Sequence, residues 1–261
     1  MYIYEIVKPG TWLVSDSSQR SWEIQSILRN IESLFFDANL ALNLFMSSFS
    51  REIINISKEQ WESDAIRRDQ IRKEVETRFS NPFDHKNWDE IHFQTEMIFK
   101  REQWRSGRIP PEFENGLAFM HARAFLYSLD LIDKFISVLE NMEGTPEKIK
   151  KIHQMFTANF PDLRGVRNTT QHLEDRARGL GAGRSPKPLE LKAINNRLVK
   201  SESGALILNS LNGTKYGNTM ADGHYGEVDV SPSSMQILSS LFQEILNCFE
   251  WTGPPVHLPS I

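Results

Sequence analysis

The sequence of 261 residues contains a single cysteine, Cys248, so no disulfide can form within the chain. No histidine lies near it in sequence, and we interpret it as a small apolar residue rather than a nucleophile. The first residues lack a basic segment followed by an apolar run, so no signal peptide is predicted. The longest apolar run, near 34–49, is interrupted by Asp37, Asn39 and Asn43 and is too polar to span a membrane. These absences predict a cytoplasmic protein without a membrane segment.

The chain also lacks an excess of one charge. It has 30 lysines and arginines against 34 aspartates and glutamates, a net charge of −4. Any nucleic-acid binding must therefore come from a local patch and not from a global basic field. The apolar and charged fractions, 39% and 25%, are ordinary for a globular protein. We find no repeat of fixed period and interpret residues 1–261 as a single domain.

Several familiar catalytic motifs are missing. There is no Walker motif, no nucleophile elbow and no His-Glu-x-x-His. Gly179, Gly181 and Gly183 follow a predicted helix rather than a strand, so they are not a dinucleotide fingerprint. Asp89, His92 and Glu96 could ligate a metal from one helix, but a helix this rich in charge produces such spacings often. We predict no resident metal and no cofactor.

Apolar residues recur at helical spacing through most of the chain. Ser57 and Gln60 fit a capping box that opens one of these helices. Thr145 and Pro146 fit the start of another. The segment 112–141 is apolar on most sides, as a central helix is. The predicted helices are 18–50, 57–79, 84–104, 112–141, 146–160 and 161–180.

The pattern changes after residue 180. A loop over 179–188 precedes a strand at 206–211, and Asn212-Gly213 is a strong signal for a two-residue hairpin. Asp222-Gly223 marks a second turn, and 225–230 alternates as a half-buried strand does. Ser231-Pro232 opens a last helix to about 251, and the tail is irregular. The predicted fold class is mainly α: a helical bundle (18–180 and 232–251) with a linker and small antiparallel β-meander (181–231) inserted before the C-terminal helix. Residues 1–15 are predicted to be a short strand or an extended arm.

The segment 161–180 is predicted to be one helix of about five turns. Its apolar stripe is Leu163, Val166, Thr170, Leu173, Ala177 and Leu180, and the opposite stripe is Arg164, Asn168, Gln171 and Asp175. Arg167 and His172 flank the polar stripe about 140° apart. To act on one phosphate they need long converging side chains, or a second copy of the helix facing the first.

Chance produces about 0.5 arginine–histidine pairs at this spacing in such a chain, and requiring an asparagine after the arginine lowers the expectation to about 0.03. Arg167-Asn168-x-x-x-His172, on a late helix of a bundle, resembles the motif of the HEPN superfamily (higher eukaryotes and prokaryotes nucleotide-binding). The resemblance implies a metal-independent endoribonuclease, usually a dimer, in which the motif helices of both subunits line one cleft. It makes Arg167 and His172 the catalytic pair and Asn168 the common polar residue after the arginine. The long N-terminal helices and the β-meander lie outside the family's core pattern.

The residue types suit that chemistry. RNA is cleaved without a metal when its 2′-hydroxyl attacks the adjacent phosphate, which needs a base, an acid and positive charge on the phosphorane. Histidine can transfer either proton, and arginine grips phosphate oxygens with two parallel donors. We assign substrate binding to Arg164, Gln171, Asp175 and Arg176.

The first hypothesis is a homodimeric endoribonuclease with RNA as its substrate. The resemblance alone suggests a toxin or phage-defence role and a partner such as an antitoxin. The alternative is a non-catalytic RNA- or protein-binding module, since some HEPN proteins bind without cutting. In the simplest interpretation, Arg167 and His172 are solvated residues on the outer face of a bundle helix. A metal-dependent enzyme using Asp89, His92 and Glu96 is a third hypothesis.

Overall fold

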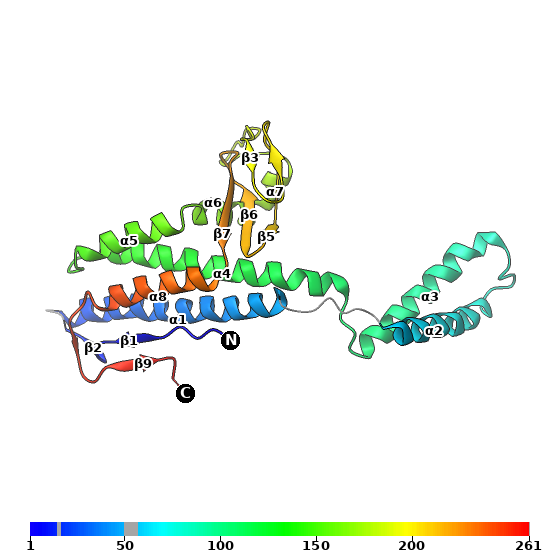
Figure 1. The fold of residues 1–261 in the computed structure, drawn as a ribbon, viewed down its shortest axis with the longest axis horizontal. Coiled ribbons are helices and arrows are strands. Elements are labelled where there is room, and N and C mark those ends of the chain that lie inside the picture. The colour runs from blue at the N-terminus through cyan, green and yellow to red at the C-terminus, as the bar shows by residue number, and fades with distance from the viewer. Residues whose placement is uncertain (15–16, 50–56, 261) are drawn as a thin grey trace. The chain divides into compact units, whose positions relative to one another are not determined.

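The computed structural model describes residues 1–14, 17–49 and 57–260. It is mainly helical with small antiparallel sheets (Figure 1). The helices are α1 (Ser18–Phe49), α2 (Lys58–Glu76), α3 (His85–Arg105), α4 (Pro111–Glu140), α5 (Lys148–Asn159), α6 (Leu163–Gln171), α7 (Leu173–Ala177) and α8 (Pro232–Leu246). The strands are β1 (Ile6–Lys8), β2 (Trp12–Leu13), β3 (Ile194–Asn195), β4 (Lys200–Ser201), β5 (Ser210–Asn212), β6 (Lys215–Thr219), β7 (Tyr225–Asp229), β8 (Trp251–Thr252) and β9 (Val256–Leu258).

The chain divides into two compact units. This division was not predicted from the sequence, which was interpreted as one domain over residues 1–261. Unit 1 is Met1–Ser47 with Leu117–Ile261, and unit 2 is Ser48–Gly116. Each unit has its own buried apolar cluster. In unit 2 that cluster joins α2 to α3 through Ile71, Val75, Ile91 and Phe99. The two amphipathic helices of unit 2 therefore cover each other's apolar stripes.

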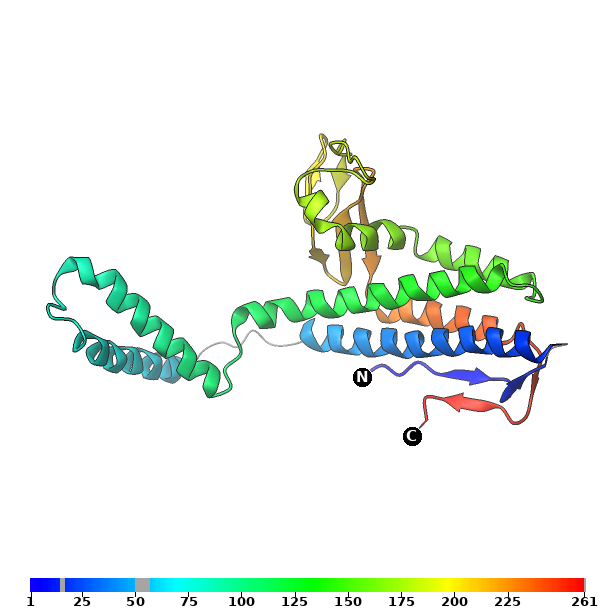
Figure 2. The same ribbon diagram turned by 180° about the vertical axis from the view of Figure 1, so that it is seen from behind.

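Unit 1 contains a helical bundle in which α1, α4, α5 and α8 lie side by side (Figures 1 and 2). Their apolar stripes share one core, because residues three or four apart on a helix share a face. The boundaries of α1 and α4 agree with prediction to within one residue. Helix α5 begins at Lys148, two residues after the predicted proline start, and Glu147 rather than Thr145 occupies its N-cap.

The two ends of the chain pair with each other. β1 pairs antiparallel with β9, and β2 with β8, in the registers Ile6↔Leu258 and Leu13↔Trp251. The prediction of an irregular tail was therefore wrong for these residues. Strands of two or three residues show no alternation, and their partners lie more than two hundred residues away, so local sequence carries no signal of the pairing.

The predicted β-meander is confirmed as the three-stranded antiparallel sheet β5-β6-β7, although its first strand is Ser210–Asn212 and not 206–211 as predicted. Side chains of β7 alternate between half-buried and buried, as predicted. Asn212 pairs with Lys215, so the hairpin loop is Gly213–Thr214, one residue later than predicted. The short pair β3–β4 was not predicted.

Helix α8 begins at the predicted cap, with the Ser231 hydroxyl accepting from the Ser234 N–H, but it ends at Leu246 and not near 251. Within residues 1–14, 17–49 and 57–260, no helix has the length and the apolar character needed to cross a membrane.

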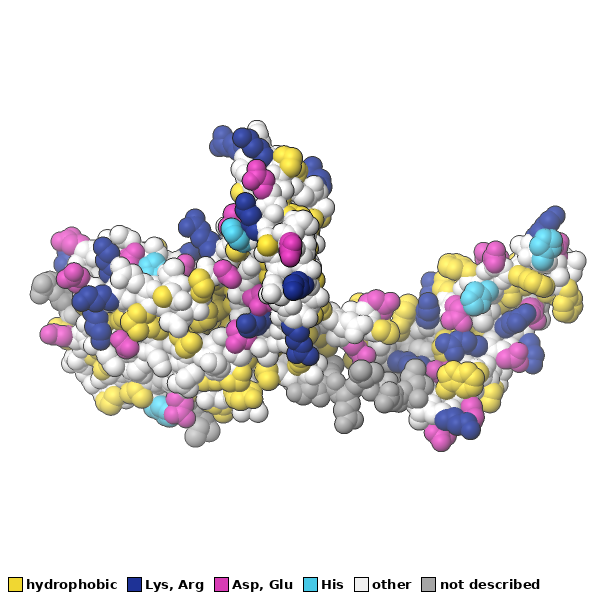
Figure 3. Space-filling model, turned by 45° about the horizontal axis from the view of Figure 1, so that its top comes forward, with side chains coloured by type: hydrophobic (Ala, Val, Ile, Leu, Met, Phe, Trp, Pro, Cys, Tyr) yellow, Lys and Arg dark blue, Asp and Glu magenta, His cyan; other side chains and the backbone are white. Residues whose placement is uncertain are grey.

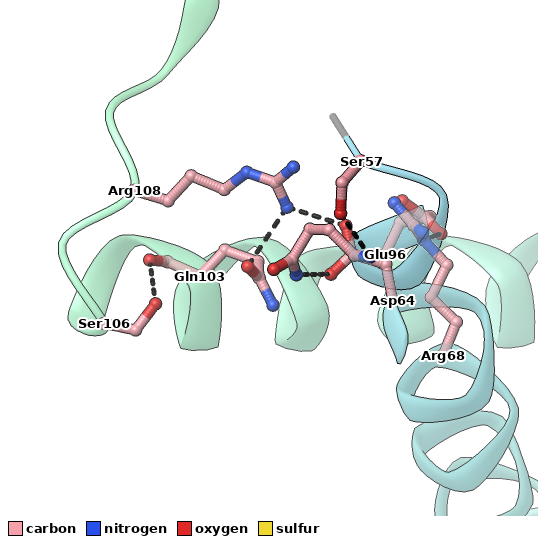
Figure 4. A network of polar contacts seen from close by, with 8 residues as sticks. Ser57, Asp64, Arg68, Glu96, Gln103, Ser106 and Arg108 are labelled. Atoms are coloured by element: carbon pink, nitrogen blue, oxygen red, sulfur yellow. Dashed lines mark hydrogen bonds and ion pairs between the residues drawn. The ribbon is translucent and has the colours of Figure 1, made fainter. Parts of the chain in front are cut away.

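In unit 2, the predicted capping box is half right. The Ser57 hydroxyl accepts a hydrogen bond from the Gln60 N–H at 3.2 Å. The Gln60 side chain does not return to the cap; it donates to Asp64 Oδ1 at 2.8 Å. Asp64 also accepts from Arg108 Nη1 at 2.7 Å, which ties α2 to the segment after α3 (Figure 4). The buried carboxylate of Asp64 is therefore the better partner for the glutamine amide.

Candidate functional site

The predicted five-turn helix at 161–180 is interrupted at His172, which separates α6 from α7. His172 has φ −120° and ψ 43°, outside the helical region. Its N–H still donates to the carbonyl oxygens of Asn168 and Thr169, at 3.0 and 3.2 Å. The hydroxyl of Thr169 donates to the carbonyl of Thr219 in β6 at 3.2 Å. This contact holds α6 against the sheet. Helix α6 ends at Gln171 and does not continue straight into α7.

The interruption changes which side chains are buried. Leu163 and Val166 are buried, as predicted. Ala177, predicted to lie on the apolar stripe, is exposed. Two arginines lie inside instead: Arg167 is 9% exposed and Arg176 only 2%. The interpretation of Arg167 as a solvated surface residue is therefore wrong.

Arg167 is the centre of a polar cluster that joins α6 to α4. Its Nη2 lies 2.6 Å from Asp130 Oδ2. Its Nη1 donates to Asn168 Oδ1 at 2.9 Å and also to Gln171 Oε1. On the solvent side, Lys134 Nζ lies 2.7 Å from the same Asp130 oxygen. Three of the predicted site residues, Arg167, Asn168 and Gln171, thus meet at one guanidinium.

Two cations favour the ionised form of the Asp130 carboxyl. Burial by itself raises its pKa, but the hydrogen bonds from Arg167 and then Lys134 outweigh burial and hold the pKa below its ordinary value of 3.8. Asp130 is 3% exposed, so its charge depends on these two cations. The cluster therefore contains one buried carboxylate shared by an internal and a half-exposed cation.

The cluster borders a cavity of about 520 Å³ between α4, α5 and α6. Its polar lining includes three cations, Lys134, Arg164 and Arg167, together with the amide of Asn168. Arg164 is exposed, as predicted. The remaining lining residues are Asp130, Asp133, Ser137, His153, Phe156, Thr157, Phe160, Pro161 and Leu163.

The cavity contains a histidine that sequence reasoning missed. His153 Nε2 lies 2.9 Å from Asp133 Oδ1, and Nδ1 lies 3.0 Å from Glu140 Oε2. Both ring nitrogens thus lie within hydrogen-bond distance of a carboxylate oxygen. Asp133 and Glu140 are seven residues apart on α4, a spacing that places them on one face. This spacing is visible in the sequence, but no local pattern indicates that the two carboxylates contact a histidine of α5.

His172 lies elsewhere. Its side chain is 60% exposed, its Nδ1 is 3.7 Å from Glu174 Oε1, and it does not line the cavity. Within one chain, the structure does not bring His172 to the cavity that Arg167 lines. The divergence expected from helical geometry thus persists after the helix is interrupted.

The other two predicted substrate-binding residues are engaged within the chain. Asp175 Oδ1 accepts from Arg178 Nη2 at 2.6 Å. Arg176 Nη1 donates to the carbonyl oxygens of Leu180 and Gly181, the latter at 2.6 Å. Arg176 is therefore buried and holds the loop after α7. The prediction that it binds substrate does not agree with this position.

The metal hypothesis gains no support. Glu96 Oε1 accepts from Arg68 Nε at 3.0 Å instead of facing an open coordination site. Among the described residues, no group of three or more histidine, cysteine, aspartate or glutamate side chains could hold a metal ion.

Compared with known proteins, the chain matches no family model, no curated protein and no solved structure. Its site residues define a polar cavity that presents guanidinium, ammonium and amide donors, from which phosphate oxygens accept, together with the carboxylates of Asp130 and Asp133.

Proposed function

We propose that this chain is a HEPN-like, metal-independent endoribonuclease that cleaves RNA by attack of the 2′-hydroxyl, with its sites shared across a homodimer. The observation that carries the proposal is the position of the motif residues. Arg167 and Asn168 line a cavity that also presents Lys134 and Arg164. A scissile phosphate in this cavity would meet three cations.

Arg167 retains a donor for such a ligand. Its Nη atoms are engaged, but its Nε–H is buried and has no hydrogen-bond partner among the described residues. A buried donor without a partner costs about 1–3 kcal/mol, so a side-chain movement that brought this donor to a phosphate oxygen would recover that free energy. Lys134, whose side chain is 54% exposed, adds a solvent-accessible cation to the cavity lining.

His172 is assigned the proton transfer in the cavity of the partner subunit. It is exposed and lies outside the cavity of its own chain, which is the geometry a shared site requires. Two-fold symmetry would bring the motif helices of both subunits to one cleft, in which the Arg167 cavity of each subunit would face the partner's His172.

The alternative, a non-catalytic RNA- or protein-binding module, is favoured by one observation. Asp130 already neutralises Arg167 within the chain, so the guanidinium is stabilised without any substrate. A binding module predicts RNA affinity without cleavage.

The first test measures cleavage of a fluorophore–quencher RNA by the purified protein, with and without EDTA. We expect cleavage that survives EDTA, products ending in 2′,3′-cyclic phosphate, and a loss of about 10²–10⁴-fold for His172→Ala. Because His172 is exposed, this variant should retain the thermal stability of the wild type. His153→Gln is the matched histidine control. If His153→Gln abolishes cleavage and His172→Ala does not, the assignment of His172 is wrong.

The second test addresses the shared site. The Arg167→Ala protein and the His172→Ala protein are each expected to be inactive. When the two are mixed in equal amounts and exchange subunits at random, half of the dimers are heterodimers, and one of the two sites in each heterodimer is intact. The mixture should therefore recover about a quarter of wild-type activity. If the wild type cleaves RNA and the mixture stays inactive, each site belongs to one chain.

A further inference from the structure

The end of the β-meander that lies away from the bundle helices in Figure 1 is joined to the linker by hydrogen bonds. The Lys192 N–H donates to the Gly223 carbonyl at 3.0 Å, joining the linker to the turn between β6 and β7. The Gly181 N–H donates to the Lys187 carbonyl at 2.7 Å, which closes the loop between them. The hairpin β3–β4 lies at the same end, above β5, β6 and β7 in Figure 1. These backbone contacts join the loops at this end to one another and to the β-meander.

This end of unit 1 carries a concentration of positive charge. Residues 178–204 contain six lysines and arginines and two glutamates, whereas the remainder of the chain contains 24 basic and 32 acidic residues. The tip of the projecting part in Figure 3 accordingly shows several dark-blue side chains. A basic segment in an otherwise acidic chain is a local patch of the kind that nucleic-acid binding requires.

Four of these residues, which we call the apical cations, are exposed and form no ion pair with any described residue. They are Arg184, Lys187, Arg197 and Lys200. The other two are already partnered: Arg178 by Asp175 at 2.6 Å, and Lys192 by Glu190 at 3.9 Å.

The surroundings of the apical cations indicate the class of ligand. Residues 178–204 contain no phenylalanine, tyrosine or tryptophan, so bases have no aromatic ring on which to stack. Leu198, 51% exposed, is the one large apolar side chain exposed in that range. A bilayer or a protein partner would need a broader apolar face. A flexible polyanion with repeated charge needs only the cations.

We propose that the apical cations bind the sugar–phosphate backbone of single-stranded RNA. The inference rests on the proposed function, and it adds a sequence-independent contact on the linker and the β3–β4 hairpin, whose cations do not line the cavity at Arg167. Each phosphate that a single strand gives up to a cation contributes about −0.7 to the slope of log affinity against log salt. The four apical cations together account for a slope of up to about −2.8.

The test measures binding of a fluorescent 2′-O-methyl oligonucleotide, which cannot be cleaved by 2′-hydroxyl attack, to the full chain. Anisotropy is recorded over about 50–200 mM salt for Arg184→Glu/Lys187→Glu and for Arg197→Glu/Lys200→Glu. Each pair should weaken binding and reduce the slope by about 1.4. Thermal unfolding should be unchanged, because the side chains are exposed.

The matched control is Lys100→Glu/Arg101→Glu, the same charge change at exposed residues of α3 in unit 2 that form no ion pair with the described part of the chain. An unchanged slope for both apical pairs, or an equal reduction for the control, overturns the inference. If the wild type cleaves RNA but the slopes are unchanged, the apical contact is refuted and the endoribonuclease proposal is not. If the slopes are reduced but the wild type does not cleave RNA, the endoribonuclease proposal is refuted and the apical contact is not. If the apical pairs reduce binding to phosphatidylserine vesicles and leave RNA binding intact, the ligand is a membrane surface and the RNA inference fails.

Discussion

Replacing Asp130 by alanine should destabilise unit 1 strongly, because it leaves the buried cation of Arg167 without its carboxylate. The two groups are 3% and 9% exposed, and their closest atoms are 2.6 Å apart. Removing one member of a buried ion pair costs about 3–5 kcal/mol. Asn168 and Gln171 still accept from Arg167, so we expect the lower end, about 3 kcal/mol. Arg167→Ala should cost about 2 kcal/mol, because Lys134 continues to pair with Asp130.

The double variant separates the interaction from the two truncations. With Asp130 and Arg167 both replaced, neither charge is left uncompensated, and the cycle should give a coupling energy of about 2 kcal/mol. The control is Lys134→Ala, which removes the half-exposed partner of the same carboxylate and should cost no more than about 1 kcal/mol. Because the chain has two units, the urea unfolding of unit 1 should be followed separately, by amide hydrogen exchange in peptides from α4 and α6.

The coupling should also depend on pH in a defined direction. The pKa of Asp130 is lower in the folded protein than in the unfolded chain, so the unfolded state binds more protons in acid. The stabilisation is complete above the ordinary value of 3.8 and is lost as the pH falls through the lower folded value. A coupling near zero at neutral pH, or one that grows on acidification, would refute the reasoning.

Three further predictions concern stability. Gly223→Ala should cost unit 1 more than about 2 kcal/mol, since Gly223 has φ 85° and a β-carbon there would lie 1.9 Å from the Glu190 carbonyl oxygen. Gly213→Ala, at φ 63° with nothing within 4 Å, should cost only about 1–2 kcal/mol in thermal unfolding, and equal losses would contradict the steric argument. Ser57→Ala should destabilise unit 2 by about 1 kcal/mol through loss of the N-cap, with Ser57→Asp as the variant that retains it. Arg108→Ala should destabilise unit 2 by about 2 kcal/mol at neutral pH. Burial raises the pKa of Asp64, but hydrogen bonds from Arg108 and Gln60 lower it overall, so urea midpoints of variant and wild type should converge in acid; a constant difference would argue against the ion pair.

Local pattern was sufficient for most of the helices. The apolar spacing of Ile24, Leu28, Ile31 and Phe35 identifies α1 because a helix repeats every 3.6 residues whatever it packs against. Ser231 and Pro232 mark the start of α8 for a similar reason, since a cap acts on its own first turn. Trp88 of α3, by contrast, is a large apolar residue that helical spacing alone would place in the core, yet it is 58% exposed, because the choice of buried face depends on which helix lies opposite.

The candidate site shows the same division. The motif Arg167-Asn168 could be found from sequence because its residues are adjacent, and helical geometry alone predicted that His172 diverges from Arg167. Asp130 and His153 could not be found, because each meets its partners only when α4, α5 and α6 pack together. The burial of Arg176 was equally hidden, because its acceptors are carbonyls of a loop whose course depends on the β-meander.

By itself, the sequence determined the helical bundle, the β-meander and the polar motif on the segment 161–180, all of which depend on spacings of a few residues. Only the tertiary structure decided that this segment is interrupted at His172, that Asp130 compensates Arg167, and that the guanidinium borders a cavity. The physical reason is that a buried charge is stable only beside its counter-ion, and the counter-ion here lies thirty-seven residues away on another helix.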